Sequence, residues 1–301
     1  MMHTDQIPID TNTLQRLLTA QFPHWADLPI VPFASSGTEN ALFRLGDHLA
    51  ARLPLRPNKA QQVHKEHRWL PHFAPHLPLP ISEPVGLGQP SNTYPSPWSV
   101  CRWLPGVHPT MDTLAHPARA AQQLAAFLLA LQKIDPTDGP SPGEHNFWRG
   151  IPLAQRDTLT QDALARSEHL LDTKAIARAW AIDRDAPTWT HRPVWIHGDL
   201  TPGNLLMTEG RLSGVIDWGG LGVGDPATDL LPAWNLFSGP SRAAFRAAMG
   251  VDDATWARGR GLALSVAVVA LPYYLHTNPT MVAGARHVIA AVLADMDSSA
   301  P

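Results

Sequence analysis

The chain has little cysteine, no excess of charge of either sign and no long hydrophobic run. A single cysteine among 301 residues excludes an intramolecular disulfide and any zinc or iron–sulfur site that needs several thiolates. With 23 basic against 26 acidic side chains, the formal charge of −3 lacks the basic footprint of a nucleic-acid-binding protein. The longest apolar stretch, residues 261–275, is shorter than the roughly 20 residues that a membrane-spanning helix needs.

The N-terminal segment also lacks the basic start and apolar run that form a secretory signal. We therefore expect a cytoplasmic protein with neither nucleic acid nor a membrane among its partners. Proline, tryptophan and histidine are abundant, with 30, 11 and 15 residues. Four histidines recur at near-helical spacing: His64, His67, His72 and His76. They could form a metal site, but without supporting carboxylates or thiols a partly solvated helix face is the favoured interpretation.

Hydrophobic periodicity divides the chain into two parts. Before residue 104, five short runs have strand character: Ile30–Phe33, Asn40–Leu45, Leu49–Leu53, Val85–Leu87 and Trp98–Trp103. A helix is expected at residues 59–70, with Pro71 ending or kinking it. Further helices are expected at residues 14–22, 117–134, 158–180, 230–237, 241–249, 254–275 and 280–296. This predicts an α+β protein with a sheet-rich N-terminal lobe (1–103), a hinge (104–108) and a mainly helical C-terminal lobe (109–301).

The most informative segment is residues 195–230, WIHGDLTPGNLLMTEGRLSGVIDWGGLGVGDPATDL. An apolar run ends in His197-Gly198-Asp199, and Asn204 follows after a Pro-Gly turn that lets the chain reverse. Two further apolar runs, joined by a turn, form a hairpin that returns the chain to Asp217. We expect two carboxylates and one amide to converge, an oxygen-rich set that suits Mg²⁺ with a phosphate substrate.

In this arrangement Asn204 and Asp217 suit metal ligation, while Asp199 suits orienting a hydroxyl group and accepting its proton. Each aspartate taken alone is more often a turn residue or a helix cap. The combined pattern is far more specific than its parts: His-Gly-Asp, an asparagine five residues on, and Asp-x-Gly after that. The combination therefore favours a catalytic site.

The segment resembles the catalytic core of the aminoglycoside phosphotransferase family, which has the protein-kinase-like fold. Two strings carry the resemblance, His-Gly-Asp-Leu-x-Pro-Gly-Asn and Ile-Asp-Trp-Gly. The resemblance implies that Asp199 is the catalytic base and that Asn204 and Asp217 hold Mg²⁺. It also implies that His197 and Asp229 support the catalytic loop, with Asp229 accepting backbone hydrogen bonds much as a helix cap would.

The same resemblance gives roles to residues of the N-terminal lobe. Arg52, on the third expected strand, stands where protein kinases place a phosphate-binding lysine, and Glu66 stands where the partner carboxylate of that lysine would be. An arginine binds phosphate bidentately and stays charged; the alternative is a surface ion pair that contributes little. The remaining implied nucleotide contacts are Ser36, Gly37 and Thr38 between the first two strands, and the backbone of Cys101, Trp103 and Leu104 at the hinge. The Cys101 side chain is expected to be an apolar filler, and the Trp103 ring either stacks on the base or packs between the lobes.

These features predict an enzyme that transfers the γ-phosphoryl group of ATP or GTP, through Mg²⁺, to a hydroxyl of a small antibiotic-like or metabolite acceptor. The family includes kinases of aminoglycosides, macrolides, choline and homoserine. Acidic residues after Asp229 are few, which disfavours a polycationic aminoglycoside. Trp148 or Arg149 could reach the acceptor pocket, or residues 145–153 are a plain interhelical loop. The alternative function is a pseudokinase that binds nucleotide without transfer. The acceptor, the choice of donor and the choice between monomer and homodimer stay open.

Overall fold

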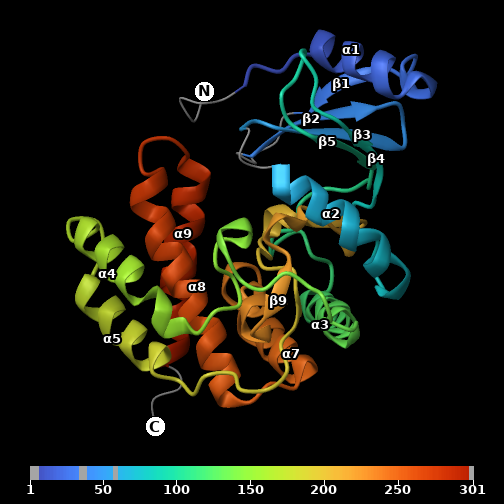
Figure 1. Cartoon of the computed structure of the whole chain (residues 1–301). Coiled ribbons are helices and arrows are strands. Elements are labelled where there is room, and N and C mark those ends of the chain that lie inside the picture. Colours follow the sequence, from blue (N-terminus) through green and yellow to red (C-terminus); the bar gives the residue numbers. More distant parts are fainter. Residues whose placement is uncertain (1–6, 34–38, 57–59, 298–301) are drawn as a thin grey trace.

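The computed structural model describes residues 7–33, 39–56 and 60–297, and the structural statements below refer to this part of the chain. Figure 1 shows a small upper lobe built on a sheet and a larger lower lobe built mainly of helices. The upper lobe contains the N-terminal strands, and the lower lobe contains α3 to α9. The arrangement has the two lobes and the α+β character that the sequence predicts.

The N-terminal lobe is built on a five-stranded antiparallel sheet with the strand order β1-β2-β3-β5-β4. Its strands are β1 (Ile30–Phe33), β2 (Asn40–Leu45), β3 (Leu49–Pro54), β4 (Pro84–Gly88) and β5 (Trp98–Arg102). Helix α1 (Thr11–Gln21) begins where the Asp10 carboxylate accepts a hydrogen bond from the Thr13 amide (2.7 Å). Its leucines pack on the sheet around Trp98, and this cluster is the core of the lobe.

Helix α2 (Ala60–Phe73) follows β3 and continues as the 3₁₀ turn η3 (Ala74–His76). It runs through Pro71 instead of ending there. Pro71 lies in the last turn of the helix, where the missing amide forfeits a single hydrogen bond. Phe73 anchors that turn, since it is fully buried with its ring 4.7 Å from the ring of Trp195. The end of α2 is therefore fixed by packing against the C-terminal lobe.

The C-terminal lobe contains helices and two small antiparallel strand pairs. Its α-helices are α3 (Pro117–Lys133), α4 (Asp157–Arg166), α5 (Thr173–Arg184), α6 (Pro232–Asn235), α7 (Gly239–Met249), α8 (Asp253–Tyr274) and α9 (Pro279–Asp297). The strand pairs are β6 (Val194–Ile196) with β9 (Gly222–Gly224), and β7 (Leu205–Thr208) with β8 (Arg211–Val215). Short 3₁₀ turns are η1 (Pro23–Trp25) in the small lobe, and η4 (Glu144–Asn146), η5 (Leu153–Arg156), η6 (Pro202–Asn204), η7 (Trp218–Gly220) and η8 (Pro226–Leu230) here.

Three expectations for this lobe need correction. Residues 158–180 are not one helical region, because α4 ends at Arg166 and Asp172 caps a new helix by accepting from the Ala175 amide (3.1 Å). Residues 230–237 hold only the four-residue helix α6. Strand β9 was not foreseen, because a Gly-Val-Gly strand has no alternation of apolar and polar side chains.

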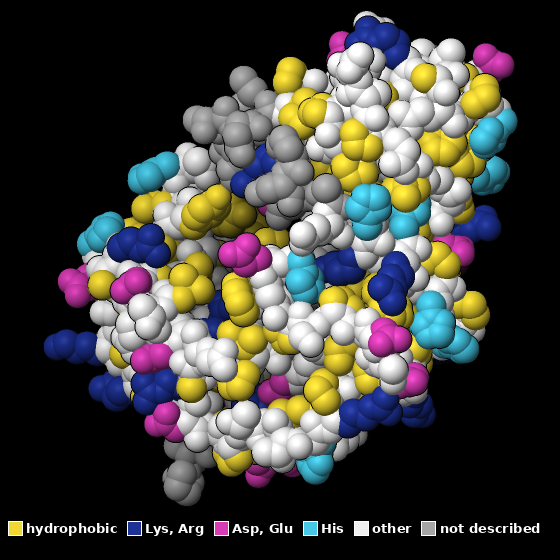
Figure 2. Space-filling model, viewed as in Figure 1, with side chains coloured by type: hydrophobic (Ala, Val, Ile, Leu, Met, Phe, Trp, Pro, Cys, Tyr) yellow, Lys and Arg dark blue, Asp and Glu magenta, His cyan; other side chains and the backbone are white. Residues whose placement is uncertain are grey.

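Helix α8 is the buried helix expected from the long apolar stretch. Most of its side chains are buried against α4, α5, α9 and η8. Within the described residues, no helix combines the length and hydropathy that crossing a bilayer requires. On the face shown in Figure 2, basic and acidic side chains are interspersed over the lower lobe.

The two lobes join after β5. The Trp103 amide donates to the His48 carbonyl (2.8 Å), and Val107 and Met207 exchange two backbone hydrogen bonds (3.0 and 2.8 Å). Gly106 has a φ of +144°, and an added Cβ would lie 3.0 Å from the Met207 carbonyl oxygen. The segment that connects the two lobes therefore requires a glycine at position 106. Its hydrogen bonds with Met207 place the end of β5 beside the β7–β8 hairpin, and the candidate site residues lie on either side of that hairpin.

Candidate active site

Arg52 of β3 connects the two lobes. Its register places it between Leu42 of β2 and Ser99 of β5. One guanidinium nitrogen donates to Glu66 Oε2 of α2 (2.7 Å), and another donates to Oδ1 of Asp217, which follows β8 (3.2 Å). The structure thus brings together three of the residues to which the sequence analysis gives nucleotide or metal roles.

Burial governs the charges of this trio. The Glu66 side chain is only 4% exposed, and burial raises the pKa of its carboxyl group while the adjacent Arg52 acts in the opposite direction. Burial alone would lower the pKa of Arg52, but the charges of Glu66 and Asp217 raise it on balance. Asp217 remains 42% exposed, so one side of the trio is open to a ligand.

The catalytic loop, residues 197–204, is held by Asp229. This fully buried carboxylate accepts hydrogen bonds from the amides of His197 (2.7 Å) and Gly198 (2.9 Å). Gly198 has a φ of +85°, and an added Cβ would lie 2.1 Å from the carbonyl oxygen of Gly220. The loop therefore needs glycine at this position, and the bracing contacts expected of Asp229 are present.

His197 joins the catalytic loop to the segment that carries Asp217. Its Nε2–H donates to the Ile216 carbonyl (3.1 Å), and its Nδ1 accepts from the Asp199 amide (3.3 Å). Its ring lies 4.6 Å from the ring of Trp218. Burial lowers the pKa of His197, so the neutral imidazole serves as a fixed donor and acceptor. These contacts hold the loop to the segment that follows β8.

Asp199 and Asn204 face each other across the loop. The Asn204 Nδ2 donates to the Asp199 carbonyl (2.7 Å) and to its Oδ2 (3.2 Å). The other carboxylate oxygen, Oδ1, lies 3.7 Å from the guanidinium of Arg149. Burial raises the pKa of Asp199, and the charge of Arg149 opposes that shift. The Asp199 side chain is 40% exposed and can therefore meet a hydroxyl group from solvent.

The donor set at this site fits Mg²⁺. Asp217 offers a partly exposed carboxylate, and it adopts a left-handed backbone conformation (φ +59°) at the start of η7. The Asn204 amide nitrogen is committed to Asp199, so its Oδ1 is the atom left to bind a cation. Mg²⁺ binds to one or two protein oxygens of this kind and completes its shell with water and substrate phosphates.

The other residues that were predicted to contact the nucleotide lie in several different places. Ser36, Gly37 and Thr38 lie outside the described residues. The Cys101 side chain is buried, and burial raises the pKa of its thiol to about 12, so this side chain fills the core. Trp103 packs edge-on against Phe33 (5.2 Å between ring centroids), and its amide is engaged with His48. The Leu104 side chain lies against Gly214 of β8.

Lys65 joins the two lobes, and its role was not predicted from the sequence. This lysine of α2 is 9% exposed, and its ammonium group donates to the carbonyls of His145 (3.1 Å), Gly219 (2.9 Å) and Leu221 (3.0 Å). It thereby ties α2 to the segment after Asp217. No sequence signal marked it, because the helical pattern through Val63, Glu66 and Leu70 does not distinguish Lys65 from an exposed lysine.

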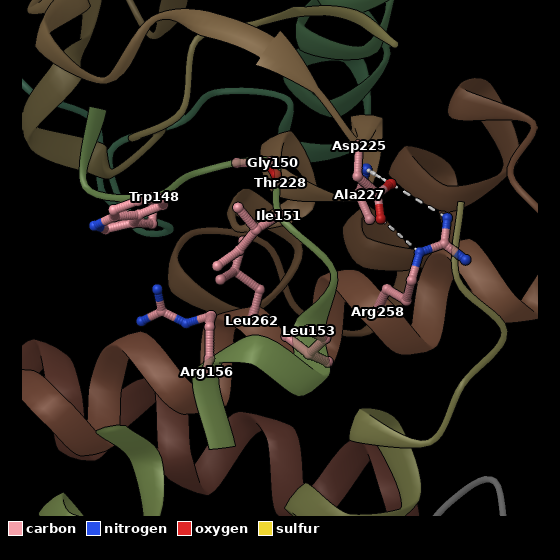
Figure 3. A pocket seen from close by; sticks show the side chains of 10 residues that line it. All are labelled: Trp148, Gly150, Ile151, Leu153, Arg156, Asp225, Ala227, Thr228, Arg258 and Leu262. Atoms are coloured by element: carbon pink, nitrogen blue, oxygen red, sulfur yellow. Dashed lines mark hydrogen bonds and ion pairs between the residues drawn. The ribbon is translucent and has the colours of Figure 1, made fainter. Parts of the chain in front are cut away.

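A small pocket lies in the C-terminal lobe, and Figure 3 shows its lining. Trp148, Gly150 and Ile151 come from the segment before η5, and Leu153 and Arg156 are the two ends of η5. Asp225 caps η8, Ala227 and Thr228 belong to η8, and Arg258 and Leu262 come from α8. In Figure 3, Arg258 pairs with Asp225 (2.6 Å), whereas the Arg156 side chain points toward Trp148. The 145–153 segment therefore lines the pocket, and its Arg149, between Trp148 and Gly150, lies 3.7 Å from the Asp199 carboxylate.

The four spaced histidines lie on and just after α2. His64, His72 and His76 are exposed, and His67 shares a hydrogen bond with Ser99 Oγ (2.9 Å). Burial lowers the pKa of His67 to about 4. In the part of the chain that the structure describes, no group of three or more His, Cys, Asp or Glu side chains could hold a metal ion.

Comparison with known proteins agrees with this geometry. The model of the phosphotransferase enzyme family matches residues 30–262. A homoserine kinase of Gluconacetobacter diazotrophicus is 30% identical over 125 residues, which are 40% of this chain and 36% of that protein. An aminoglycoside 3'-phosphotransferase of Escherichia coli is 30% identical over 115 residues, 37% of this chain and 41% of that protein. The chain therefore spans less than half the length of these relatives.

A solved structure extends the comparison to the whole fold. The GDP complex of wild-type aminoglycoside 2'-phosphotransferase-IIIa superimposes with a TM-score of 0.75 at 19% sequence identity. The similarity covers 96% of this chain and 100% of that one. The fold is therefore the bilobal, protein-kinase-like α+β fold that the sequence predicts.

Proposed function

Because the chain belongs to the phosphotransferase enzyme family, we propose that it transfers the γ-phosphoryl group of ATP or GTP, with Mg²⁺, to a hydroxyl group of a small molecule. The contact of Arg52 with both Glu66 and Asp217 carries this proposal. It joins a cationic phosphate-binding candidate on β3 to an oxygen ligand for a cation in the other lobe. Residues 104–108 form the proposed hinge between the nucleotide-binding and acceptor-binding lobes.

Asp199 is the proposed general base. Its carboxylate accepts a hydrogen bond from the acceptor hydroxyl, orients that oxygen and takes its proton as the new bond forms. The acceptor oxygen bonds to the γ-phosphorus, the bond from phosphorus to the bridging oxygen breaks, and the nucleoside diphosphate leaves with the electron pair. Arg149 favours the ionised carboxylate, and Asn204 holds its second oxygen at 3.2 Å.

Arg52 is the proposed phosphate-binding residue, held in place by Glu66. Its charge and forked geometry suit phosphate oxygens, and the ion pair with Glu66 (2.7 Å) fixes its direction. Asn204 and Asp217 would hold Mg²⁺, which when bound neutralises phosphate charge that builds up during transfer. Further nucleotide contacts are proposed for the loop Ser36–Thr38 and for the backbone at Leu104.

A phosphoryl-transfer assay tests this function. ATP or GTP is supplied with Mg²⁺ and with a panel of hydroxyl acceptors that includes homoserine and aminoglycosides, because the curated relatives are kinases of these compounds. We expect at least one acceptor to be phosphorylated, and we expect EDTA to stop the reaction. If nucleotide binds, no acceptor reacts, and slow nucleotide hydrolysis is equal in wild type and Asp199→Asn, the protein is a nucleotide-binding pseudokinase instead.

A further inference from the structure

Two neighbouring arginines, Arg149 and Arg156, are buried without full charge compensation, and Arg149 is the one that lies beside Asp199. Arg149 is 8% exposed and Arg156 is 7% exposed. The Nε of Arg149 is buried without a hydrogen-bond partner in the described structure, and its ion pair with Asp199 is long, at 3.7 Å. Arg156 donates from Nε to the hydroxyl of Ser265 (3.1 Å). No carboxylate of the described residues lies within 4 Å of the Arg156 guanidinium.

Other buried arginines of the same lobe have close acidic partners. Arg258 contacts Asp225 at 2.6 Å, and Arg260 contacts Asp183 at 2.8 Å. A buried guanidinium without an anion loses its hydration and gains little in return, which makes such a position costly. Burial and the nearby charge of Arg149 lower the pKa of Arg156 to about 9, so Arg156 remains cationic at neutral pH. The positive charge of Arg156 can therefore pair with the negative charge of a bound ligand.

The position of Arg156 makes it available to a ligand. It lines the pocket of Figure 3, and its side chain points toward Trp148 across that pocket. The enclosed space is small, about 10 Å³, which is room for about one water molecule or one carboxylate oxygen, and the pocket opens to solvent at its mouth. On the opposite wall, the Arg258 charge is already matched by Asp225. The other anion near the pocket, Asp229, is committed to two backbone amides. Arg156 is therefore the pocket's uncompensated cation.

We propose that this pocket binds a carboxylate of the acceptor, so that the substrate is a small molecule with both a hydroxyl group and a carboxylate. The proposal rests on the proposed function, because it places the hydroxyl at Asp199 and the carboxylate at Arg156. The Asp199 carboxylate offsets one of the two arginine charges, so about one positive charge is left, which matches a carboxylate better than a doubly charged phosphate. A polycationic acceptor would face the wrong sign of charge.

Pairs of acceptors that differ only in charge test the proposal. We would compare ω-hydroxy acids of increasing length, such as 4-hydroxybutanoate, with their neutral primary amides. For wild type we expect kcat/KM to be about ten- to hundredfold higher for the acid, since a charged hydrogen bond is replaced by a neutral one. Arg156→Gln should bring the ratio close to one, and Arg156→Lys should keep part of it. An acid-to-amide ratio near one in wild type, or a preference for kanamycin over every acid, would overturn the proposal.

A second measurement separates this inference from the proposed function. Thermal unfolding is followed with increasing acetate, with acetamide at equal ionic strength as the neutral control. We expect a saturable rise in Tm with acetate for wild type and for Arg166→Gln, an exposed arginine of α4 that matches the charge change. Arg156→Gln should lose the rise. If acetate acts on wild type but no acceptor is phosphorylated, the anion site stands and the transferase proposal fails. If acetate and acetamide act alike on wild type, the anion site is refuted whatever the assay shows.

Discussion

Replacing Arg52 with methionine should leave the Glu66 carboxylate buried without its cation. Removing one partner of a buried ion pair costs about 3 to 5 kcal/mol. Glu66 can escape part of this cost by taking up a proton. From an ordinary pKa of 4.5, that uptake costs about 3.4 kcal/mol at pH 7 and about 0.7 kcal/mol at pH 5. Arg52→Met should therefore lose about 3 kcal/mol relative to wild type at pH 7 and less than about 1 kcal/mol at pH 5.

The sign follows from burial. Because burial raises the pKa of Glu66 in the folded state, its charged form costs stability at high pH, and this cost disappears as the pH falls through that pKa. Urea unfolding followed by tryptophan fluorescence at several pH values measures the effect. Arg52→Lys is the charge-conserving control, and Arg52→Met combined with Glu66→Gln should recover much of the loss. A destabilisation independent of pH, or no recovery in the double variant, would refute this explanation.

Two further substitutions test the catalytic loop. Gly198→Ala should cost about 3 kcal/mol or more in urea unfolding and abolish activity, since the new Cβ would meet the Gly220 carbonyl oxygen at 2.1 Å. Gly250→Ala, also at positive φ but with open space around it, should cost only about 1 kcal/mol, and equal losses would contradict the steric argument. Arg149→Met should move the acidic limb of the pH–rate profile to higher pH, because Asp199 must be ionised and Arg149 lowers its pKa; an unmoved limb would separate Arg149 from the base.

Local sequence predicted the parts of the site that lie close together in the chain. The His-Gly-Asp string, Asn204 and Asp217 are joined by one turn and one hairpin, so their convergence follows from local structure. Arg52 and Glu66 were found through their spacing and the family resemblance, and their contact is present at 2.7 Å.

Contacts between distant segments could not be predicted in this way. Lys65 reaches Gly219 and Leu221 across the interface of the lobes, and nothing in the helix pattern marks a lysine for burial. The closeness of Arg149 to Asp199 depends on how the 145–153 segment returns to the catalytic loop. Pro71 was expected to end or kink the helix, and α2 continues past it to Phe73, where packing of the buried Phe73 ring offsets one lost hydrogen bond.

The most direct test of the central claim is the rate of phosphoryl transfer by Asp199→Asn at saturating nucleotide, measured beside nucleotide affinity. The amide keeps the size of the side chain but cannot take the acceptor proton. We expect the rate to fall by about 10² to 10⁴-fold, while nucleotide Kd stays within about threefold of wild type because Arg52 and Asp217 are intact. Transfer at the wild-type rate would contradict the role of Asp199, and a parallel loss of nucleotide binding would contradict the separation of proton transfer at Asp199 from nucleotide binding at Arg52 and Asp217.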